Sequence, residues 1–439
     1  MDAENILCTV KWNLCSGCGI CVGVCPKKCL SWKYEKGMYY PYIDANSCIS
    51  CGICKKVCPG LSHRYEKNEG YKAVEGKVLI SYSAWSKSPE IRHVSASGGV
   101  VSSIIQYLLE NKIYDRAFLV DSYDYHQQVL TRLVTVQDVE NISVSDYPKS
   151  RYIPVSHENA IAYMKSNRSK KVILIGTSCA IRGFTSAIEL LNLKRENYLM
   201  IGLFCDRVFN YNVADYYQQS VFCHNKKLEK LHFKNKESGG WPGNMKFIFT
   251  DGTVAYQDKT ERVKIKDYFM PERCLYCIDK LNVYADISVG DNYTQQDSSL
   301  LGSNSVIIRT DVGMAVWNRM KTLLEYKMVS VEKIMKAQYI DGRLNNFYYG
   351  KLKEKVISKK TGEQIVLNEG IIVTQDPQIY RKVWKNNLNM LKAGETYREN
   401  PKELQKQMKA AKKKRKSGVG RRILKRGYRC IKYWITKGE

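Results

Sequence analysis

Beyond Gly70, apolar and polar residues alternate along the chain with two different periods, and each period predicts an element of secondary structure. Apolar residues three and four positions apart predict helices, and short continuous apolar runs predict buried strands. Strands are expected at residues 78–82, 117–120, 172–175, 199–203 and 286–289, and helices at residues 100–109, 158–166, 180–191 and 211–220. Because strands that alternate with helices usually pair in parallel, this order predicts a mixed α/β domain with a largely parallel sheet over residues 77–340.

A hairpin is expected to interrupt this order. Residues 245–249 and 253–256 form two short strands joined by Asp251-Gly252, a dipeptide typical of tight hairpin turns. Residues 341–439 are predicted to form a helical extension followed by a basic tail that is helical or disordered. No apolar run approaches the length of about 18 residues needed to span a membrane, and the hydrophobic content of 44% excludes a disordered chain.

The first 68 residues are distinguished by their cysteines, since ten of the 16 in the chain precede residue 60. Two runs share the pattern C-x2-C-x2-C-x3-C followed by proline, and they are Cys15, Cys18, Cys21 and Cys25, then Cys48, Cys51, Cys54 and Cys58. In such runs three thiolates on one tight loop bind one [4Fe-4S] cluster, and the fourth reaches the other cluster. We therefore expect one cluster on Cys15, Cys18, Cys21 and Cys58, and a second cluster on Cys48, Cys51, Cys54 and Cys25.

Zinc is the alternative metal for these thiols. Zinc sites usually combine two separate C-x2-C pairs, so the duplicated run with its trailing Cys-Pro favours iron–sulfur clusters. Residues 1–68 resemble a bacterial two-cluster ferredoxin, which implies an α+β domain of hairpins and short helices. Cys8 and Cys29 are left over, and we expect them to be small buried hydrophobic residues.

Ser97-Gly98-Gly99 is a candidate for chemistry in the α/β region, because it lies between a predicted strand and the start of a helix. Free backbone N–H groups at that position favour a phosphate. On these residues alone, an ordinary helix N-cap is the better explanation.

A second candidate is a group of four cysteines. Cys179 and Cys205 each follow a predicted strand, and parallel strands bring their carboxyl ends to one edge of the sheet. Cys274 and Cys277 form a C-x2-C pair shortly before another strand, so the four thiols could converge on one site. Ordinary buried cysteines, half a zinc site and a redox dithiol remain open as alternatives.

Eight short motifs in order over residues 77–336 give the chain a family resemblance. It resembles the beta subunits of coenzyme F-420-reducing hydrogenases and formate dehydrogenases, with their bacterial relatives. The motifs are Ser97-Gly98-Gly99, Ser150-Arg151-Tyr152, Gly176-Thr177-Ser178-Cys179, Gly202-Leu203-Phe204-Cys205, Trp241 after Lys234, Arg273-Cys274-Leu275-Tyr276-Cys277, Ala285-Asp286-Ile287-Ser288-Val289-Gly290-Asp291 and Val306-Ile307-Ile308-Arg309-Thr310.

The resemblance implies two further cofactors, FAD and a third [4Fe-4S] cluster. It places Ser97, Gly98 and Gly99 against the FAD phosphates, with Arg151 and Tyr152 nearby, and it adds Gly176, Thr177, Gly290 and Asp291 to the cofactor-binding set. It also implies that Cys179, Cys205, Cys274 and Cys277 bind the third cluster. The chain departs from its relatives at Ser178 and Ala180, at Asp206 and at Asn292-Tyr293, which puts the relatives' substrates in doubt.

These inferences predict an iron–sulfur flavoprotein oxidoreductase. Clusters carry single electrons, and a flavin pairs them for hydride transfer to or from an unidentified substrate or a deazaflavin- or nicotinamide-type carrier. The alternatives are an electron-transfer subunit that docks on a partner enzyme without a substrate of its own, and a non-redox zinc scaffold. Asp206, His93 and Asp291 are candidate proton donors, but structural hydrogen bonding explains each of them equally well, and no catalytic residue is assigned. A redox partner protein or a small-molecule electron carrier is the expected partner.

The formal charge of +27 is uneven, because residues 401–439 hold fifteen Lys and Arg against two Glu. The basic run at residues 412–416 and the later Trp434 fit peripheral contact with an anionic membrane. A solvated, disordered arm is the favoured alternative, and nucleic-acid binding is unlikely to be its role because no nucleic-acid fold accompanies it. Asp2 and Glu4 stand where a secretory signal needs basic residues, so a cytoplasmic protein is expected, with membrane contact limited to the inner face.

Overall fold

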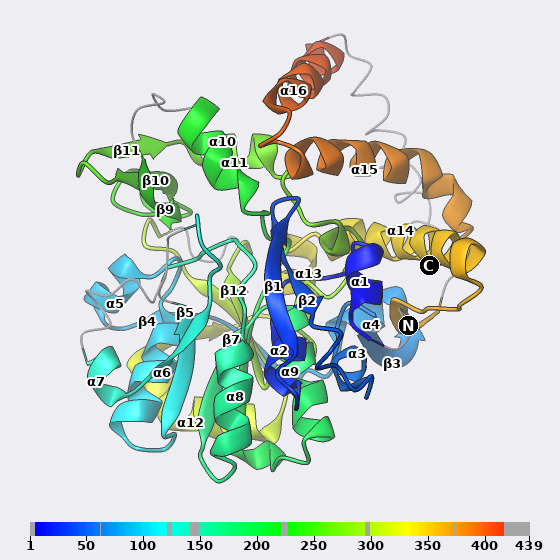
Figure 1. Cartoon of the computed structure of the whole chain (residues 1–439). Coiled ribbons are helices and arrows are strands. Elements are labelled where there is room, and N and C mark those ends of the chain that lie inside the picture. The colour runs from blue at the N-terminus through cyan, green and yellow to red at the C-terminus, as the bar shows by residue number, and fades with distance from the viewer. Residues whose placement is uncertain are drawn as a thin grey trace, which may run out of the picture.

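The computed structural model describes residues 5–61, 63–120, 125–140, 149–220, 227–294, 299–372 and 375–416. An eight-stranded sheet in the order β14-β4-β13-β12-β8-β7-β5-β6 forms the centre of the molecule (Figure 1). Its strands are β4 (Ile80–Ser86), β5 (Arg116–Val120), β6 (Thr131–Val134), β7 (Val172–Gly176), β8 (Tyr198–Leu203), β12 (Ile287–Asp291), β13 (Asn304–Ile308) and β14 (Leu324–Met328). The predicted α/β class is therefore confirmed.

The sheet is mixed. Strands β12, β8, β7 and β5 pair in parallel at its centre. Strand β6 on one flank and strands β13, β4 and β14 on the other are antiparallel to their neighbours. The prediction of a largely parallel sheet thus holds for the centre and is corrected at both flanks. A parallel connection needs a crossover of a dozen or more residues, and the segment between β5 and β6 is too short for one.

Side chains of the central strands alternate between two layers of helices, as a period of two requires. In β7, Ile173 faces the core shared with α6 (Val100–Glu110) and α12 (Asp311–Met320). Val172 and Leu174 face the opposite core, shared with α8 (Glu158–Ser166) and α9 (Ser178–Leu190). Short helices α5 (Pro89–Val94) and α7 (Val136–Val139) also lie on the α6 side.

The cysteine-rich N-terminal region packs on the α8–α9 layer (Figure 1). Its elements are α1 (Leu7–Lys11), α2 (Ile20–Val24), the antiparallel hairpin of β1 (Leu30–Glu35) and β2 (Met38–Ile43), and α3 (Ile53–Lys56). Two glycines allow a close approach. A Cβ on Gly23 would lie 2.6 Å from Ile161 Cβ, and a Cβ on Gly183 would lie 2.7 Å from Ile20 Cγ1. The predicted hairpin-and-short-helix region is therefore seated directly on the α/β core.

A second, antiparallel sheet is formed by β9 (Leu228–Asn235), β10 (Asn244–Phe249) and β11 (Val254–Gln257). The hairpin of β10 and β11 was predicted, whereas β9 was not. Charged and apolar residues are mixed in β9, and only its packing against β10 and α10 (Asn212–Ser220) buries the apolar ones. Helix α11 (Lys259–Ile265) covers the same core.

The described C-terminal part, up to Lys416, consists of helices and one strand. Its elements are α13 (Val331–Ala337), α14 (Ile340–Thr361), α15 (Arg381–Glu395) and α16 (Pro401–Lys416), and strand β15 (Asn368–Ile372) pairs in parallel with β3 (His63–Glu69), which precedes α4 (Gly70–Glu75). Single 3-10 turns are η1 (Arg195–Asn197), η2 (Glu272–Tyr276), η3 (Lys321–Leu323) and η4 (Pro377–Tyr380). The rest of the basic tail, with Trp434, lies outside the described residues. The domain boundaries 1–68, 77–340 and 341–439 stay predictions.

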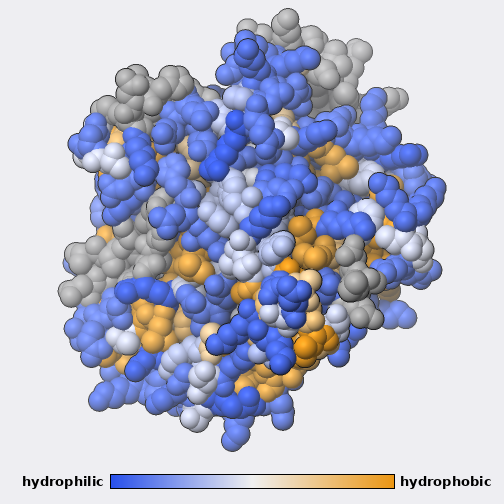
Figure 2. Space-filling view, viewed as in Figure 1, coloured by the Kyte–Doolittle hydropathy of each residue, from blue (hydrophilic) through white to orange (hydrophobic). Residues whose placement is uncertain are grey.

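Hydrophilic residues cover most of the face shown in Figure 2, and apolar residues appear there as separate patches. Within the described ranges, none of the helices is both long and apolar enough to cross a membrane.

Candidate metal centres and redox site

The first predicted ligand set lines a single cavity. Cys15, Cys18, Cys21 and Cys58 meet there, together with Ser16, Gly19, Trp32 and Pro59. Cys18 lies on the loop before α2, Cys21 in the first turn of α2, and Cys58 just after α3. Gly19 has a left-handed backbone (φ 74°) that only glycine adopts without strain, and it turns the loop into the helix. The structure thus brings three cysteines of one run together with the last cysteine of the other, and this arrangement fits a cubane.

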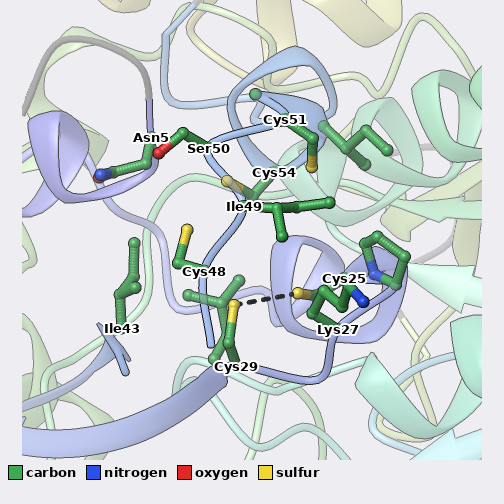
Figure 3. A pocket seen from close by; sticks show the side chains of 14 residues that line it. Asn5, Cys25, Lys27, Cys29, Ile43, Cys48, Ile49, Ser50, Cys51 and Cys54 are labelled. Carbon is green, nitrogen blue, oxygen red and sulfur yellow. Dashed lines mark hydrogen bonds between the residues drawn. The ribbon is translucent and has the colours of Figure 1, made fainter. Parts of the chain in front are cut away.

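The second ligand set lines another cavity, shown in Figure 3. Cys25, Cys48, Cys51 and Cys54 surround it. Gly52, also left-handed (φ 70°), precedes α3 as Gly19 precedes α2. Cys51 is exposed, so this second site lies at the surface.

Cys29 lines the second cavity too, and its Sγ lies 3.5 Å from Cys25 Sγ (Figure 3). Cys29 is buried in a small hydrophobic cluster with Leu30 and Ile43, as expected, but its sulfur also faces the other thiols of this cavity. Cys8 is only partly buried, and its thiol donates a hydrogen bond to the Asn5 carbonyl oxygen at 3.2 Å. A local hydrogen bond rather than core packing explains its position.

The four cysteines of the α/β region also meet. Cys179 lies in the first turn of α9, Cys205 follows β8, and Cys274 and Cys277 lie in and after η2. Burial raises the pKa of Cys205 well above its usual value, and the neighbouring Cys274, Cys179 and Cys277 raise it further. Burial likewise raises the pKa of Cys274 to about 11, with Cys179 and Cys277 adding to the effect. Four mutually interacting, partly buried thiols suit a metal cluster rather than a single ion, because the described residues contain no group of three or more ligands placed to hold one metal ion.

Two buried arginines give an independent test of that fit. Arg273 Nη1 and Arg343 Nε have no hydrogen-bond partner among the described residues, although both side chains are buried. Although burial acts in the opposite direction, Cys277, Asp206, Cys205 and Cys274 raise the pKa of Arg343, so its cation faces the thiol group. Leaving a buried cationic donor unsatisfied is costly. A metal cluster of net negative charge held by the four thiolates would satisfy both arginines.

The first and third cysteine groups are neighbours. Burial raises the pKa of Cys18 to about 11, and the nearby Cys179 raises it further. Ser16 lines the first cavity, and its side chain acts to lower the pKa of both Cys18 and Cys179, so it lies near both groups. On the other side, Cys54 of the second group helps to raise the pKa of Cys21, after burial and nearer thiols. The three groups therefore follow one another from the surface to the sheet.

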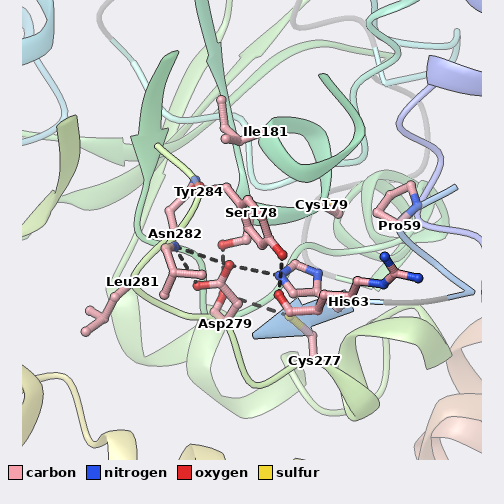
Figure 4. A network of polar contacts seen from close by, with 12 residues as sticks. Pro59, His63, Ser178, Cys179, Ile181, Cys277, Asp279, Leu281, Asn282 and Tyr284 are labelled. Carbon is pink, nitrogen blue, oxygen red and sulfur yellow. Dashed lines mark hydrogen bonds and ion pairs between the residues drawn. The ribbon is translucent and has the colours of Figure 1, made fainter. Parts of the chain in front are cut away.

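A buried polar network centred on Asp279 adjoins Cys179 and Cys277 of the third group (Figure 4). The Asp279 carboxylate lies 3.2 Å from His63 Nε2, and its backbone oxygen accepts hydrogen bonds from Ser178 Oγ at 2.7 Å and Cys277 Sγ at 3.8 Å. Burial lowers the pKa of His63, although Asp279 acts in the opposite direction. The network ties the start of helix α9, which carries Cys179, and the loop that carries Cys277 to strand β3.

The predicted flavin residues fall into two linked groups, and the first is the loop before α6. Ser97 Oγ donates to Ser303 O at 2.7 Å, and Lys236 Nζ donates to Ser97 O at 2.6 Å. A Cβ on Gly98 would lie 2.8 Å from Ala84 O, and Gly99 is left-handed (φ 83°). Protein groups therefore hold this loop closely.

Asn304 on β13 connects the loop with the end of β12. Its Oδ1 accepts a hydrogen bond from Val100 N at 3.3 Å, and its Nδ2 donates to Gly290 O at 3.1 Å. A Cβ on Gly290 would collide with the Phe204 ring, so packing requires this glycine. The first N–H group of α6 is thus capped by a side chain from another strand.

The second flavin group surrounds a buried ion pair between Lys234 and Asp291. Tyr293 OH donates to Asp291 Oδ2 at 3.0 Å, and Lys234 Nζ lies 5.9 Å from the centre of the Tyr152 ring. The Trp241 and Tyr293 rings lie 5.5 Å apart. Aromatic surfaces with a few convergent polar groups are typical of cofactor pockets, so this group fits a flavin better than the loop before α6 does.

Three predicted flavin residues remain. Arg151 is buried beside Tyr152, and its Nη1 donates to Lys149 O. Gly176 ends β7, and Thr177 Oγ1 lies 3.2 Å from Cys179 Sγ. Gly176 and Thr177 therefore adjoin the third cysteine group rather than the Lys234–Asp291 pair.

Of the three candidate proton donors, His93 is an exposed residue of α5, and Asp206 and Asp291 behave as structural anions. Although burial acts in the opposite direction, Arg207 and Arg343 hold the pKa of Asp206 well below its usual value. Lys234 lowers the pKa of Asp291, although burial alone would raise it. Neither carboxyl group is protonated near neutral pH.

Sequence reasoning missed Ser16, Lys236, Asn304 and Arg343. Ser16 is an x position of the first cysteine run, where the motif specifies no residue, and the other three lie outside the motifs. Their roles come from partners distant in the chain.

Comparison with known proteins agrees with this geometry. The family described as coenzyme F420 hydrogenase/dehydrogenase, beta subunit matches this chain with its N-terminal part at residues 81–162 and its C-terminal part at residues 169–337. A 4Fe-4S dicluster domain matches residues 14–60. The protein is an iron–sulfur protein of the oxidoreductase class. It belongs to the coenzyme F420 hydrogenase/dehydrogenase beta subunit family and carries an N-terminal 4Fe-4S dicluster domain.

Similar proteins include a subunit of the F(420)H(2) dehydrogenase of Methanosarcina mazei, 24% identical over 72% of this chain and 85% of that protein. The beta subunit of coenzyme F420 hydrogenase of Methanosarcina barkeri is 25% identical over 56% of this chain and 79% of that protein. Coenzyme F420-dependent sulfite reductase of Methanocaldococcus jannaschii is 25% identical over 54% of this chain but only 36% of that protein. A chain in the F420-reducing [NiFe] hydrogenase complex of Methanosarcina barkeri shares the fold, with a TM-score of 0.50 and 19% identity over 67% of this chain and 98% of that chain.

Proposed function

We propose that this protein is an iron–sulfur flavoprotein oxidoreductase with three [4Fe-4S] clusters and one FAD. The observation that carries the proposal is the contact between the first and third cysteine groups, where Arg273, next to Cys274, donates a hydrogen bond to the carbonyl oxygen of Pro59, next to Cys58, at 3.1 Å. Cysteine groups that adjoin one another from the surface to the carboxyl edge of a parallel sheet are what a relay of single electrons requires. A zinc scaffold has no need of that arrangement.

The ligands in this proposal are the twelve predicted cysteines. Cys15, Cys18, Cys21 and Cys58 would hold the first cluster; Cys25, Cys48, Cys51 and Cys54 the second; and Cys179, Cys205, Cys274 and Cys277 the third. When bound, the clusters would supply one-electron chemistry and the flavin would supply two-electron hydride chemistry. Arg273 and Arg343 would balance the negative charge of the third centre from buried positions.

FAD is assigned to the region around Lys234, Asp291 and Tyr152. The buried Lys234 ammonium and the aromatic rings of Tyr152, Trp241 and Tyr293 offer a cation and flat apolar surfaces. Contact of Ser97, Gly98 and Gly99 with the phosphates is part of the proposal. It requires the phosphates to replace the Asn304 side chain at Val100 N–H.

A deazaflavin is the substrate that we favour, because the names of three similar proteins refer to coenzyme F420. A nicotinamide-type carrier is the other hydride partner consistent with a flavin. The one-electron partner would meet the second site, where Cys51 and Ile49 are exposed, the latter by 59%.

The competing function is that of an electron-transfer subunit without a substrate of its own. Two of the similar proteins are named as subunits, and this favours docking on a partner enzyme. Peripheral contact of the basic tail with an anionic membrane stays a separate prediction. Co-sedimentation with phosphatidylglycerol vesicles would test it, comparing the full chain with one that ends at Ala411.

Anaerobic analysis of iron, sulfide and flavin in the purified chain tests the proposal. Three clusters require about 12 Fe per chain, together with one FAD. A measured content of about eight iron atoms per chain would show that the third cluster is absent. Zinc in place of iron would overturn the iron–sulfur assignment. Full iron without flavin, and no reduction of coenzyme F420 by the isolated chain, would leave the electron-transfer subunit as the function.

A further inference from the structure

The second cysteine site contains one thiol more than a cubane needs. Five cysteines line this cavity, and they are Cys25, Cys29, Cys48, Cys51 and Cys54 (Figure 3). A [4Fe-4S] cluster takes four protein thiolates. Cys48, Cys51 and Cys54 belong to one C-x2-C-x2-C loop, so they occupy three irons. Either Cys25 or Cys29 can therefore bind the fourth iron.

Backbone geometry brings Cys29 back to the same corner as Cys25. Cys25 ends helix α2, and Lys28 adopts a left-handed backbone (φ 50°) that side chains other than glycine rarely take. The turn is closed by a hydrogen bond from Lys28 N to Cys25 O at 3.4 Å, and Cys29 is anchored by Asp44 N, which donates to Cys29 O at 2.9 Å. As a result, the two sulfur atoms lie 3.5 Å apart, and each side chain is only 8% exposed.

We propose that Cys29 is an alternative fourth ligand of the second cluster and exchanges with Cys25 at one iron. In the exchange the Cys29 thiol loses its proton as its sulfur bonds to iron. The Cys25 sulfur leaves the iron and takes up a proton, and no electron is gained or lost. This inference rests on the proposed function only in requiring a cluster at the second site.

Among the described residues, the lining of the first site includes no fifth cysteine. Four of the residues that line its cavity are cysteines. The position that follows Cys58 by four residues, which corresponds to Cys29 in the repeat, is Ser62 in the sequence. The difference matches the location of the two sites, because exposed Cys51 belongs to the second site, whereas the first site lies beneath it. A second ligand is useful where solvent and oxidants reach the cluster.

Four variants of the full chain test the proposal, each purified anaerobically: Cys25→Ser, Cys29→Ser, the double variant, and Cys58→Ser as the control at the first site. The measurements are iron and sulfide content and the electron paramagnetic resonance spectrum after dithionite reduction. We expect Cys25→Ser to keep the parent iron content with an altered second-cluster signal. We expect the double variant and Cys58→Ser each to lose about four Fe per chain. Loss of the same amount from Cys25→Ser as from the double variant would overturn the proposal.

Cys29→Ser gives a second readout that does not depend on how well Cys25→Ser folds. This variant should keep all of its iron but lose the second cluster several-fold faster than the parent when a chelator is added. An unchanged rate of loss would also overturn the proposal. A parent protein without iron at the second site would instead contradict the proposed function, and the iron content of the parent therefore separates the two failures.

Discussion

Arg273 donates a hydrogen bond from Nη2 to the carbonyl oxygen of Pro59 at 3.1 Å, and each of these residues directly adjoins a predicted cluster ligand. Arg273 precedes Cys274 of the third group, and Pro59 follows Cys58 of the first group. This single contact joins segments more than 200 positions apart in the chain. It holds the N-terminal ferredoxin-like region and the α/β core in a fixed relation at the point where electrons would have to pass.

Replacement of Arg273 by glutamine should weaken both the contact and the third centre. Loss of a hydrogen bond to a buried carbonyl costs about 1–3 kcal/mol in the free energy of unfolding. Removing a positive charge beside a cluster disfavours its reduced, more negative state, so the midpoint potential of the third centre should fall. Chemical denaturation and a redox titration followed by paramagnetic resonance would measure the two effects. Arg64→Gln is the control, since Arg64 is exposed and pairs with exposed Glu369. Equal potentials in the Arg273 variant and the parent would contradict the prediction.

Replacement of Cys274 by serine should remove one cluster and spare two. The expected loss is about four Fe per chain, because the other eight assigned ligands of the N-terminal sites are untouched. Flavin reduction by dithionite-reduced clusters should be lost as well. Iron analysis and stopped-flow absorbance would show this. If the two N-terminal cluster signals disappear instead, the division of ligands between the sites is wrong.

Breaking the Lys234–Asp291 pair should destabilise the protein and release flavin. Removing one partner of a buried ion pair leaves an uncompensated charge and costs about 3–5 kcal/mol. Lys234→Met and Asp291→Asn should therefore each be less stable than the double variant, in which neither charge remains. Thermal unfolding and flavin content after gel filtration would be compared. As a control, Lys33→Met breaks the exposed pair with Glu35 and should change stability by about 1 kcal/mol or less. Full flavin content in the two single variants and the double variant would show that FAD does not bind in this region.

Substitution of Asn304 tests whether the loop before α6 meets the flavin phosphates. Asn304→Asp can still accept the Val100 N–H hydrogen bond but places a negative charge there, so flavin content should fall. Asn304→Ala leaves that N–H group open to a phosphate, so flavin should be retained, at a cost in stability of about 0.5–2 kcal/mol for the lost cap. The same flavin content in both variants would show that the loop does not contact the phosphates.

Local sequence determined the parts of this protein whose partners are close in the chain or share one loop. The spacing of Cys15 to Cys25 and of Cys48 to Cys58 was enough to define two cysteine sites, because tight loops fix where such side chains point. The periods of apolar residues located the central strands and the helices around them. The convergence of Cys179 and Cys205 also followed from sequence, because the ends of parallel strands share one edge.

Tertiary packing decided the features that depend on contacts between elements distant in the chain. The antiparallel flanks of the sheet, the Arg273–Pro59 hydrogen bond between the first and third cysteine groups, and the burial of Lys234 against Asp291 join residues far apart in the chain. Periodicity reports only which face of an element is apolar, and it does not report the element against which that face packs. The position of Cys29 shows that sequence patterns can also miss a contact between residues close in the chain. A left-handed turn at Lys28, which no motif signals, brings the Cys29 sulfur to Cys25 at the second site.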